Sequence, residues 1–252
     1  MPYRTLTTDE LTEYLHLNAG DVERLLRETD IPHERRGGRI AFRRSEIDEW
    51  ASRRLLHLPG KPLDIYHEKS MRATRDLFPG AALIPELLRT EYIDLALTSK
   101  TQSSVVRDMV ALATQTARVL DPRELATSVR ERETLCSTAL PGGLALLHAR
   151  HLAPYRFEGS FIVLGRTIQP VPFGAPDGRP TQLFFLICCD DDRIHLHALA
   201  RLCLLAMKTD VVSRLHAAEN AAAAFDALVN AEKSVLPPPT GETTKRARRG
   251  AA

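Results

Sequence analysis

Apolar residues recur at helical spacing in two short segments near the beginning of the chain, residues 5–16 and 19–29. The positions that share one helical face are Leu11, Tyr14 and Leu15 in the first segment and Val22, Leu25 and Leu26 in the second. Threonines begin the first segment and Asn18 precedes the second, and such residues cap helices by accepting a hydrogen bond from the first turn. The pattern predicts a helix, a tight turn and a second helix.

A hairpin and a third helix follow. Gly37 and Gly38 lie between two short extended arms in the stretch HERRGGRIAFRR, which is the pattern of a hairpin with a two-residue turn. Ser45 then begins a helix with the sequence SEIDEWASRRLL. The apolar positions of this helix are Ile47, Trp50 and Leu55. They can cover the first two helices, so residues 1–57 are predicted to form a small domain.

The pattern weakens over residues 58–80, where prolines and glycines interrupt a mixed-charge stretch with one predicted helix near Tyr66 to Arg75. We interpret this stretch as a linker. From residue 81 to 233, strand-like and helical runs alternate, which predicts an α/β domain in which helices flank a mixed sheet. Residues 234–252 are rich in proline and threonine and then basic, and we expect this tail to be disordered.

The composition is that of an ordinary globular protein. Hydrophobic residues make up 44% of the 252 residues and charged residues 26%, which excludes a wholly disordered or fibrous chain. The apolar runs are too short to span a bilayer, and the first ten residues lack the apolar stretch of a signal peptide. We therefore expect a cytoplasmic protein. The four cysteines show no CxxC spacing, so we expect no metal, no structural disulfide and no cofactor.

Since the net charge is only +2, contact with nucleic acid needs a local basic patch. Residues 5–50 resemble the excisionase-type winged helix-turn-helix, which is related to the mercury-regulator group, with an Ile-Pro junction, an arginine-rich wing and a closing F-x-x-S-x-I-x-x-W pattern. The resemblance implies that the second helix reads the major groove of duplex DNA and the wing follows a phosphate backbone. The implied DNA contacts are Asn18, Arg24 and Arg27 on the second helix and Arg35, Arg36, Arg39, Arg43 and Arg44 around the wing. A merely solvated hairpin is the alternative, because residues 1–60 hold eleven acids against ten arginines.

The segment RETLCSTALPGGLALLHARH, residues 132–151, resembles the signature of type 2 IIA domains of the phosphoenolpyruvate-dependent phosphotransferase system, in the fructose, mannitol and nitrogen-regulatory branch. The match continues in PVPFGAPDGRPTQLFFLI, residues 170–187, and in HLHALARL, residues 195–202. Residues 84–113 resemble the opening strand and first helix of the family. The resemblance therefore spans most of the predicted α/β domain.

By position in this resemblance, His148 is the phosphoryl acceptor, His195 is the second active-site histidine and Arg132 is the arginine beside them. A phosphohistidine needs one imidazole nitrogen as nucleophile, the other held by a hydrogen bond, and cationic or donor neighbours for the incoming phosphoryl group. Ser137 and Thr138 are the hydroxyl donors that could support the phosphoryl group.

The chain departs from the family pattern at a few positions: Cys136 replaces a glycine, Leu147 replaces the proline before the histidine, Pro141 interrupts the glycine-rich approach and Gly174 replaces an acid. If the glycine replaced by Cys136 has a positive φ, a side chain there introduces strain. These departures leave open an interaction domain that resembles IIA and is not phosphorylated.

The two resemblances together predict a bacterial transcriptional regulator. Its IIA-like domain would be phosphorylated by the histidine-containing phosphocarrier protein and would modulate binding of DNA or of a regulated protein. The alternatives are a protein-histidine phosphotransferase component that passes the phosphoryl group to a IIB sugar-permease component, and the unphosphorylated interaction protein. Acids on the second helix weaken the expected affinity of a monomer for DNA, which favours a homodimer or a cooperative array.

Overall fold

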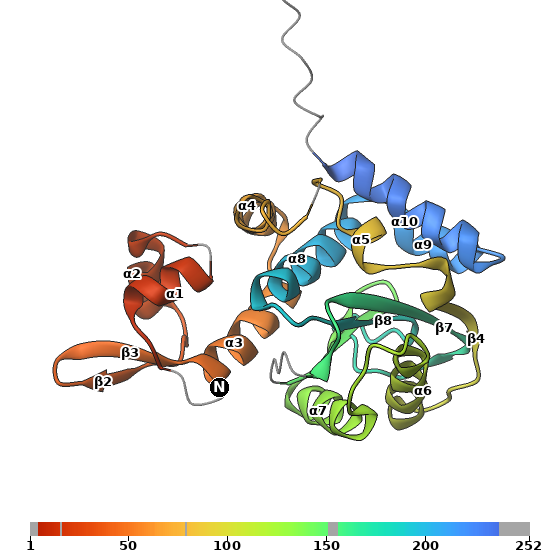
Figure 1. Cartoon of the computed structure of the whole chain (residues 1–252), viewed down its shortest axis with the longest axis horizontal. Coiled ribbons are helices and arrows are strands. Elements are labelled where there is room, and N and C mark those ends of the chain that lie inside the picture. The colour runs from red at the N-terminus through yellow and green to blue at the C-terminus, as the bar shows by residue number, and fades with distance from the viewer. Residues whose placement is uncertain (1–4, 16, 79, 151–155, 237–252) are drawn as a thin grey trace, which may run out of the picture.

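The computed structural model describes residues 5–15, 17–78, 80–150 and 156–236. A small N-terminal unit and a larger α/β unit lie on opposite sides of helices α3 (Arg44–Leu56) and α4 (Gly60–Ala73) (Figure 1). This arrangement confirms the predicted fold class, a winged helix-turn-helix followed by a mixed sheet flanked by helices.

The N-terminal unit is held by capped helices around a small apolar core. Its elements before α3 are β1 (Thr5–Leu6), α1 (Thr8–Tyr14), α2 (Ala19–Glu28), β2 (Glu34–Arg36) and β3 (Arg39–Arg43). Thr7 caps α1 and Asn18 caps α2, each in a reciprocal capping box with the residue three positions later. Leu11, Val22 and Ile47 are fully buried, so α1, α2 and α3 share one core.

Strands β2 and β3 form the wing. They pair antiparallel with Arg36 opposite Arg39, and β1 adds to the other edge of β3. Gly37 and Gly38 have φ values of +56° and +80°, which is the pattern of a type I′ turn. Glycine adopts this left-handed backbone without steric penalty, so the Gly-Gly pair in the sequence specifies the hairpin.

The α/β unit is built on a mixed five-stranded sheet. Its strands are β4 (Ile93–Leu97), β5 (Ala139–Leu140), β6 (Leu144–His148), β7 (Phe161–Val171) and β8 (Thr181–Cys188). The order across the sheet is β4-β7-β8-β6-β5. The two outer pairs of strands differ in direction: β4 runs parallel to β7, and β5 runs antiparallel to β6. In the centre, β7 and β8 are antiparallel and β8 and β6 are parallel.

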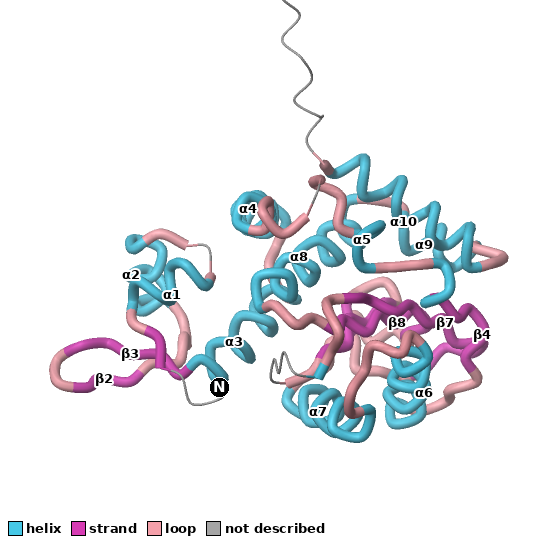
Figure 2. Tube along the Cα trace, viewed as in Figure 1, coloured by secondary structure: helices cyan, strands magenta, loops and turns pink. Residues whose placement is uncertain are grey.

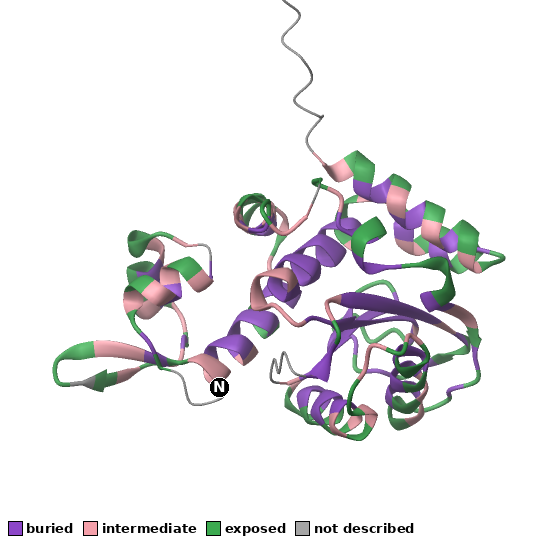
Figure 3. Cartoon of the chain, viewed as in Figure 1, coloured by how far each residue is buried: buried purple, intermediate pink, exposed green. Residues whose placement is uncertain are grey.

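Helices cover both faces of this sheet (Figure 2). The helical elements of the unit are α5 (Ile84–Leu87), the 3-10 turn η1 (Thr90–Tyr92), α6 (Gln102–Gln115), α7 (Pro122–Leu135), α8 (Asp192–Lys208), α9 (Val211–Ala217) and α10 (Ala221–Val235). Helices α6 and α7 lie on one face, and α8, α9 and α10 lie on the other. Every residue of β6 is buried (Figure 3). A strand enclosed on both faces needs the continuous apolar run that the sequence has there.

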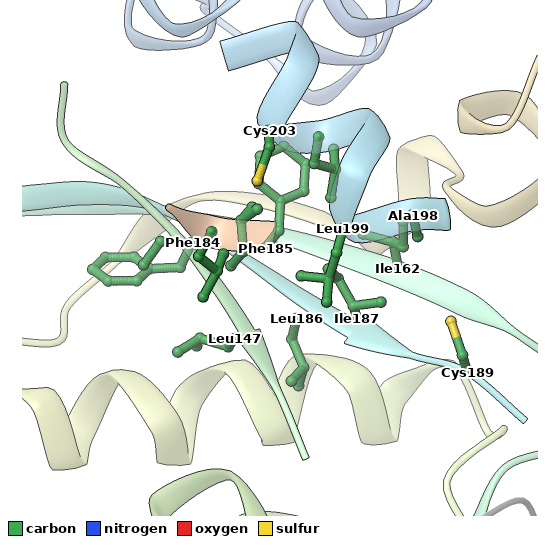
Figure 4. Close-up of a cluster of buried hydrophobic side chains, with 14 of the residues drawn as sticks. Leu147, Ile162, Phe184, Phe185, Leu186, Ile187, Cys189, Ala198, Leu199 and Cys203 are labelled. Atoms are coloured by element: carbon green, nitrogen blue, oxygen red, sulfur yellow. The ribbon is translucent and has the colours of Figure 1, made fainter. Parts of the chain in front are cut away.

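The core shows how the strands distribute their side chains between the two helical layers. In Figure 4, Leu147 and Leu186 point toward one helical layer, whereas Ile187 lies beside Leu199 of α8 in the other. Alternation along each strand produces this division, since successive side chains leave opposite faces of a sheet.

The segment expected to be a linker, residues 58–80, consists mostly of helix α4. Pro59 is its N-cap residue and Pro62 lies in its first turn. The amide groups of a first turn have no partner within the helix, so proline is tolerated there. The prolines that suggest a loop in the sequence therefore begin a helix in the structure.

Helix α4 packs against α8, near which it lies in Figure 1, and a buried polar network joins the two helices. Arg201 of α8 donates to His67 Nε2 of α4 at 2.6 Å, and the Ser70 hydroxyl lies 2.8 Å from His197 Nδ1. Arg201 also forms an ion pair with Glu232 of α10. The network joins the segment that follows the N-terminal unit to the α/β unit.

Helix α10 ends at Val235, so the predicted tail of residues 234–252 begins within this helix, and residues 237–252 lie outside the described residues. In the part of the chain that the structure describes, no helix is both long and apolar enough to cross a membrane. The four cysteines are free thiols, and Cys188, Cys189 and Cys203 are buried.

Candidate functional site

His148 is the last residue of β6, and strand alternation decides its direction. Since Leu147 faces the layer that contains α6 (Figure 4), the next side chain projects from the opposite face, where α8 lies. Its neighbour there is His195 in the first turn of α8, with the ring centroids 5.2 Å apart. His148 is 1% exposed and His195 is 2% exposed. The two predicted histidines therefore form a buried pair.

Two hydrogen bonds define the tautomer of His148. Nδ1 lies 2.8 Å from the carbonyl oxygen of Leu146, and because a carbonyl can only accept, Nδ1 carries the proton. Arg132 Nε donates to Nε2 at 3.0 Å, so Nε2 holds a lone pair. Nε2 is therefore the nucleophilic nitrogen of this ring.

Two buried nitrogens of this cluster have no hydrogen-bond partner among the described groups, Nη2 of Arg132 and Nδ1 of His195, whose ring lies against that of His148. The Arg132 guanidinium is anchored by its Nη1, which donates to the carbonyl of Cys136 at 3.0 Å. Buried polar groups are normally paired, and an exception at a functional site indicates a missing ligand or a catalytic role. The geometry suits an anion with several acceptor oxygens next to Nε2.

Burial keeps both rings neutral. Burial lowers the pKa of His148 well below its ordinary value, and the charge of Arg132 and the neighbouring His195 lower it further. Burial, and then Arg132, lowers the pKa of His195 to about 3. A neutral imidazole is a nucleophile and an imidazolium is not, so the surroundings maintain the reactive form.

The hydroxyls of Ser137 and Thr138 are engaged elsewhere in this structure. Ser137 donates to the carbonyl of Phe173, and Thr138 donates to the carboxylate of Glu133. Support of a phosphoryl group by these hydroxyls stays a prediction, and it requires an exchange of these hydrogen bonds.

The departures from the family pattern fit the geometry. Cys136 has a φ of −167°, which is extended backbone that any residue adopts, so its side chain introduces no strain. Leu147 is fully buried in the core. Gly174 has a φ of +75°, and a Cβ there would lie 3.2 Å from that of Ser137, so glycine suits this position.

Helix α3 of the N-terminal unit contacts His195 of the histidine pair and residues on both sides of the pair. The contacts are Ser52 Oγ to His195 Nε2 at 3.4 Å, Glu49 to Arg150 at 3.5 Å, and an ion pair between Arg44 and Asp192. Glu49 and Ser52 are three positions apart and share a face of α3, and Arg44 at the start of the helix extends the contact to the beginning of α8. The contact places the N-terminal unit beside the histidine pair.

Sequence reasoning missed Ser52, which contacts a residue 143 positions away. A serine within an amphipathic helix gives no signal for such a partner, because hydrophobic periodicity reports the face that is buried and not the element that buries it.

The predicted DNA contacts on α2 differ in their surroundings. Asn18 caps the helix, its side chain accepting from Asp21 N at 2.8 Å. Arg24 pairs with Asp21 at 2.7 Å and is half exposed, and Arg27 is exposed. Arg27 therefore lies on the exposed face of α2, whereas Arg24 lies on the side of α2 that is turned toward α4, where Lys69 pairs with the same Asp21.

The wing arginines also differ in exposure and in their partners. Arg35 and Arg39 are exposed on the hairpin, and Arg43 forms ion pairs with neighbouring glutamates. Arg36 lies in β2, and its side chain is outside the described part of the structure. Arg44 is turned toward Asp192 and lies over the ring of Tyr14, 5.5 Å from its centroid. A DNA contact through Arg44 requires that ion pair to open.

Two protein-family models match the chain. The model described as "Phosphoenolpyruvate-dependent sugar phosphotransferase system, EIIA 2" matches residues 86–231, and a helix-turn-helix domain model matches residues 5–55. The first match contains the histidine pair and Arg132, and the second contains α1, α2, the wing and most of α3.

Two curated relatives and one solved structure resemble the α/β unit. The fructose-specific EIIABC component of Bacillus subtilis (strain 168) is 29% identical over 152 residues, which cover 60% of this chain and 24% of that protein. A nitrogen regulatory protein of Bradyrhizobium diazoefficiens is 29% identical over 159 residues, 62% of this chain and 97% of that one. The crystal structure of nitrogen regulatory protein IIA-Ntr from Neisseria meningitidis superimposes with a TM-score of 0.53 and 26% identity, covering 58% of this chain and 99% of that one.

Proposed function

We propose a function for this chain from the family to which it belongs, the EIIA 2 family of the phosphoenolpyruvate-dependent sugar phosphotransferase system, and from its N-terminal helix-turn-helix domain. The chain is a DNA-binding transcriptional regulator. The histidine-containing phosphocarrier protein phosphorylates it on Nε2 of His148, and phosphorylation changes how the N-terminal domain binds DNA.

The site supports the chemistry of this step. The lone pair of Nε2 attacks the phosphorus of the phosphohistidine on the carrier, the N–P bond of the donor breaks, and its electron pair returns to the donor imidazole. Arg132 Nη2 and His195 Nδ1 are then placed to donate to the oxygens of the transferred group. Arg132 Nε, which occupies Nε2 in this structure, must release it as the phosphoryl group arrives.

The observation that carries the regulatory part is that α3 of the DNA-binding domain contacts His195, the neighbour of His148. A donor cannot reach a side chain that is 1% exposed, so α3 must separate from α8 before transfer. The transferred group also brings about two negative charges to the side of the site where Glu49 and Asp192 lie, which opposes closure. Phosphorylation and this docked position of the DNA-binding domain therefore compete.

Phosphorylation of the full-length protein tests this proposal. The protein is incubated with phosphoenolpyruvate, enzyme I and the phosphocarrier, and acid-labile phosphate is located by mass spectrometry. We expect modification of His148 and none in a His148→Ala variant. Phosphate retained on that variant would contradict the assignment of the acceptor.

The Arg44→Ala variant tests separately whether α3 limits access to His148. Loss of the ion pair with Asp192 weakens the contact between α3 and α8, so phosphorylation is expected to be faster than in the wild type. Arg43→Ala is the matched control, because the adjacent Arg43 pairs with glutamates of its own domain. Equal rates for the wild type and both variants would show that α3 does not limit access.

The same burial favours a second candidate, an interaction domain in which the histidine pair is not phosphorylated. The absence of phosphate on every variant, including Arg44→Ala, would support it. Transfer to a IIB component is a third outcome, and adding such a component to the phosphorylated protein and following the loss of its phosphate would detect it.

A further inference from the structure

A cavity of about 210 Å³ lies between the N-terminal unit and α4, away from the histidine site. Helices α2, α3 and α4 all line it. Its apolar walls include Leu25, Trp50, Leu55 and Ile65. Ile65 is 56% exposed and lies on the face of α4 that is turned away from the buried His67. The cavity is therefore open to solvent and mostly apolar.

The polar groups around this cavity are mainly cationic. Arg24, Arg54 and Lys69 line it together with one acid, Asp21. Asp21 is already engaged by Arg24 at 2.7 Å and by Lys69 at 3.1 Å. The remaining cation, Arg54, lies over the ring of Trp50 with its guanidinium carbon 5.3 Å from the centroid.

Two groups of the lining are without a polar partner among the residues that the structure describes. Arg54 has its contact with the Trp50 ring and no carboxylate partner. The hydroxyl of Tyr66 is buried and makes no hydrogen bond. An apolar cavity lined by a small number of polar groups has the usual composition of a small-molecule site.

We propose that this cavity binds a small organic carboxylate with an apolar, preferably aromatic, body. The carboxylate pairs with the Arg54 guanidinium, which presents planar donors that match its two oxygens. The apolar body lies against Trp50 and the leucines. The volume is below the 300–1,000 Å³ typical of pockets for drug-sized ligands, so the expected ligand is small.

The position of the cavity gives such a ligand a consequence for the domain arrangement. Its walls belong to the DNA-binding unit on one side and to α4 on the other, and α4 is bound to α8 by the buried network around Arg201. A ligand that contacts both walls stabilises the docked arrangement, because it binds that state more tightly than a separated one.

Trp50 reports binding directly, since it is the single tryptophan of the chain and lines the cavity. The full-length protein is titrated with phenylacetate, 3-phenylpropionate and octanoate, and fluorescence is checked by calorimetry. We expect saturable binding of at least one carboxylate with a Kd of about 1 mM or tighter. The matched neutral amide should bind at least tenfold more weakly.

Two variants locate the ligand, and two more are controls. Arg54→Gln removes the anion partner, and Ile65→Glu places a like charge at an exposed position of the lining, so each should weaken carboxylate binding at least tenfold. Arg53→Gln is the matched control, because Arg53 pairs with Asp30 and is not part of the lining. His148→Ala should bind the carboxylate normally, so that failure here is separable from failure of the proposed function.

No saturable response to any of the three carboxylates at 10 mM, or equal affinity for carboxylate and amide, would overturn the proposal. Self-association of the protein that Ile65→Glu abolishes would assign the cavity to a second copy of the chain and would overturn it as well.

Discussion

Arg132 makes contacts at His148 that a lysine could not make together. Its Nε donates to the ring, its Nη1 holds the carbonyl of Cys136, and its Nη2 remains available to an incoming anion. A guanidinium presents these donors in one plane, whereas an ammonium is a single point charge on a flexible stem.

Arg132→Lys is therefore expected to keep the charge and lose the geometry. We expect phosphoryl transfer to His148 to slow by about 10²–10³-fold, the usual loss when one positioned donor to a developing charge is removed. Single-turnover transfer from the labelled phosphocarrier measures the rate. His195→Ala should also slow transfer while leaving the acceptor in place. A rate within threefold of the wild type for Arg132→Lys would show that charge alone suffices.

Glu232 shows how strongly one buried charge depends on its partner. Its carboxylate accepts from the backbone amides of Leu83 and Ile84 at 2.8 and 3.0 Å and pairs with Arg201, which is fully buried. Glu232→Gln leaves that guanidinium without a counter-charge. We expect a loss of about 3–5 kcal/mol in the free energy of unfolding. Urea denaturation measures it, with the exposed Glu219→Gln as the control that should stay within about 0.5 kcal/mol of the wild type.

At the scale of elements, the wing presents its arginines on a rigid hairpin. Arg35 and Arg39 are exposed and lie close to the Gly37-Gly38 turn. If the wing follows a phosphate backbone, replacing both with alanine lowers DNA affinity and removes about two released counterions. The plot of log K against log salt should then flatten by about 1.8. An unchanged slope in gel-shift titrations would move the contact away from the wing.

The elements also show what the sequence can and cannot specify. The wing and α2 could be predicted because a Gly-Gly turn and an asparagine cap act through neighbouring residues. The pair His148 and His195 could be predicted through the family motif. Helix α4 was expected as a linker, because its prolines resemble loop signals until their place in the first turn is known. The contact of α3 with His195 has no signal in the local sequence, since Ser52 meets His195 only through tertiary packing.

At the scale of the whole molecule, buried histidines make stability depend on pH. Burial lowers the pKa of His67 and of His195 to about 3 and that of His148 well below its ordinary value. The unfolded chain therefore binds more protons than the folded chain below about pH 6.5, and the stability that these groups contribute is lost as pH falls. Asp48 acts in the opposite direction, because burial raises its pKa to about 6 and its contribution is lost as pH rises.

Burial also raises the pKa of Glu133 and Glu232 and lowers that of His216. Four histidines therefore stand against three carboxyls, and the free energy of unfolding should decrease from pH 7 toward pH 4.5. Denaturation in urea across this range measures the slope. His67→Gln removes one of the groups and should give a flatter dependence. A stability that is constant or rises on acidification would mean that the histidines are accessible and protonated in the folded protein.

Phosphorylation should change DNA affinity if it competes with the docking of α3 on α8. The expected coupling is about 1–3 kcal/mol, a roughly 5–150-fold change in Kd, and bound DNA must shift the phosphorylation equilibrium by the same factor. Operator affinity is compared for the unmodified protein, the phosphorylated protein and His148→Ala treated with the same donor. Equal affinities across all three would leave two independent modules on one chain.

The contact between α3 and α8 would also set the rate at which His148 is phosphorylated. If the acceptor reacts only while α3 is lifted, the observed rate of phosphorylation is the intrinsic rate multiplied by the fraction of molecules that are open. Minor states of proteins are commonly populated at about 0.1–10%, and each additional 1.4 kcal/mol of contact between α3 and α8 divides that fraction by about ten. The few side chains that join the two helices, Arg44 and Ser52 among them, would then tune a response time without touching the reacting atoms. Their substitution among relatives would change how fast the protein registers a phosphoryl donor while its chemistry stays the same.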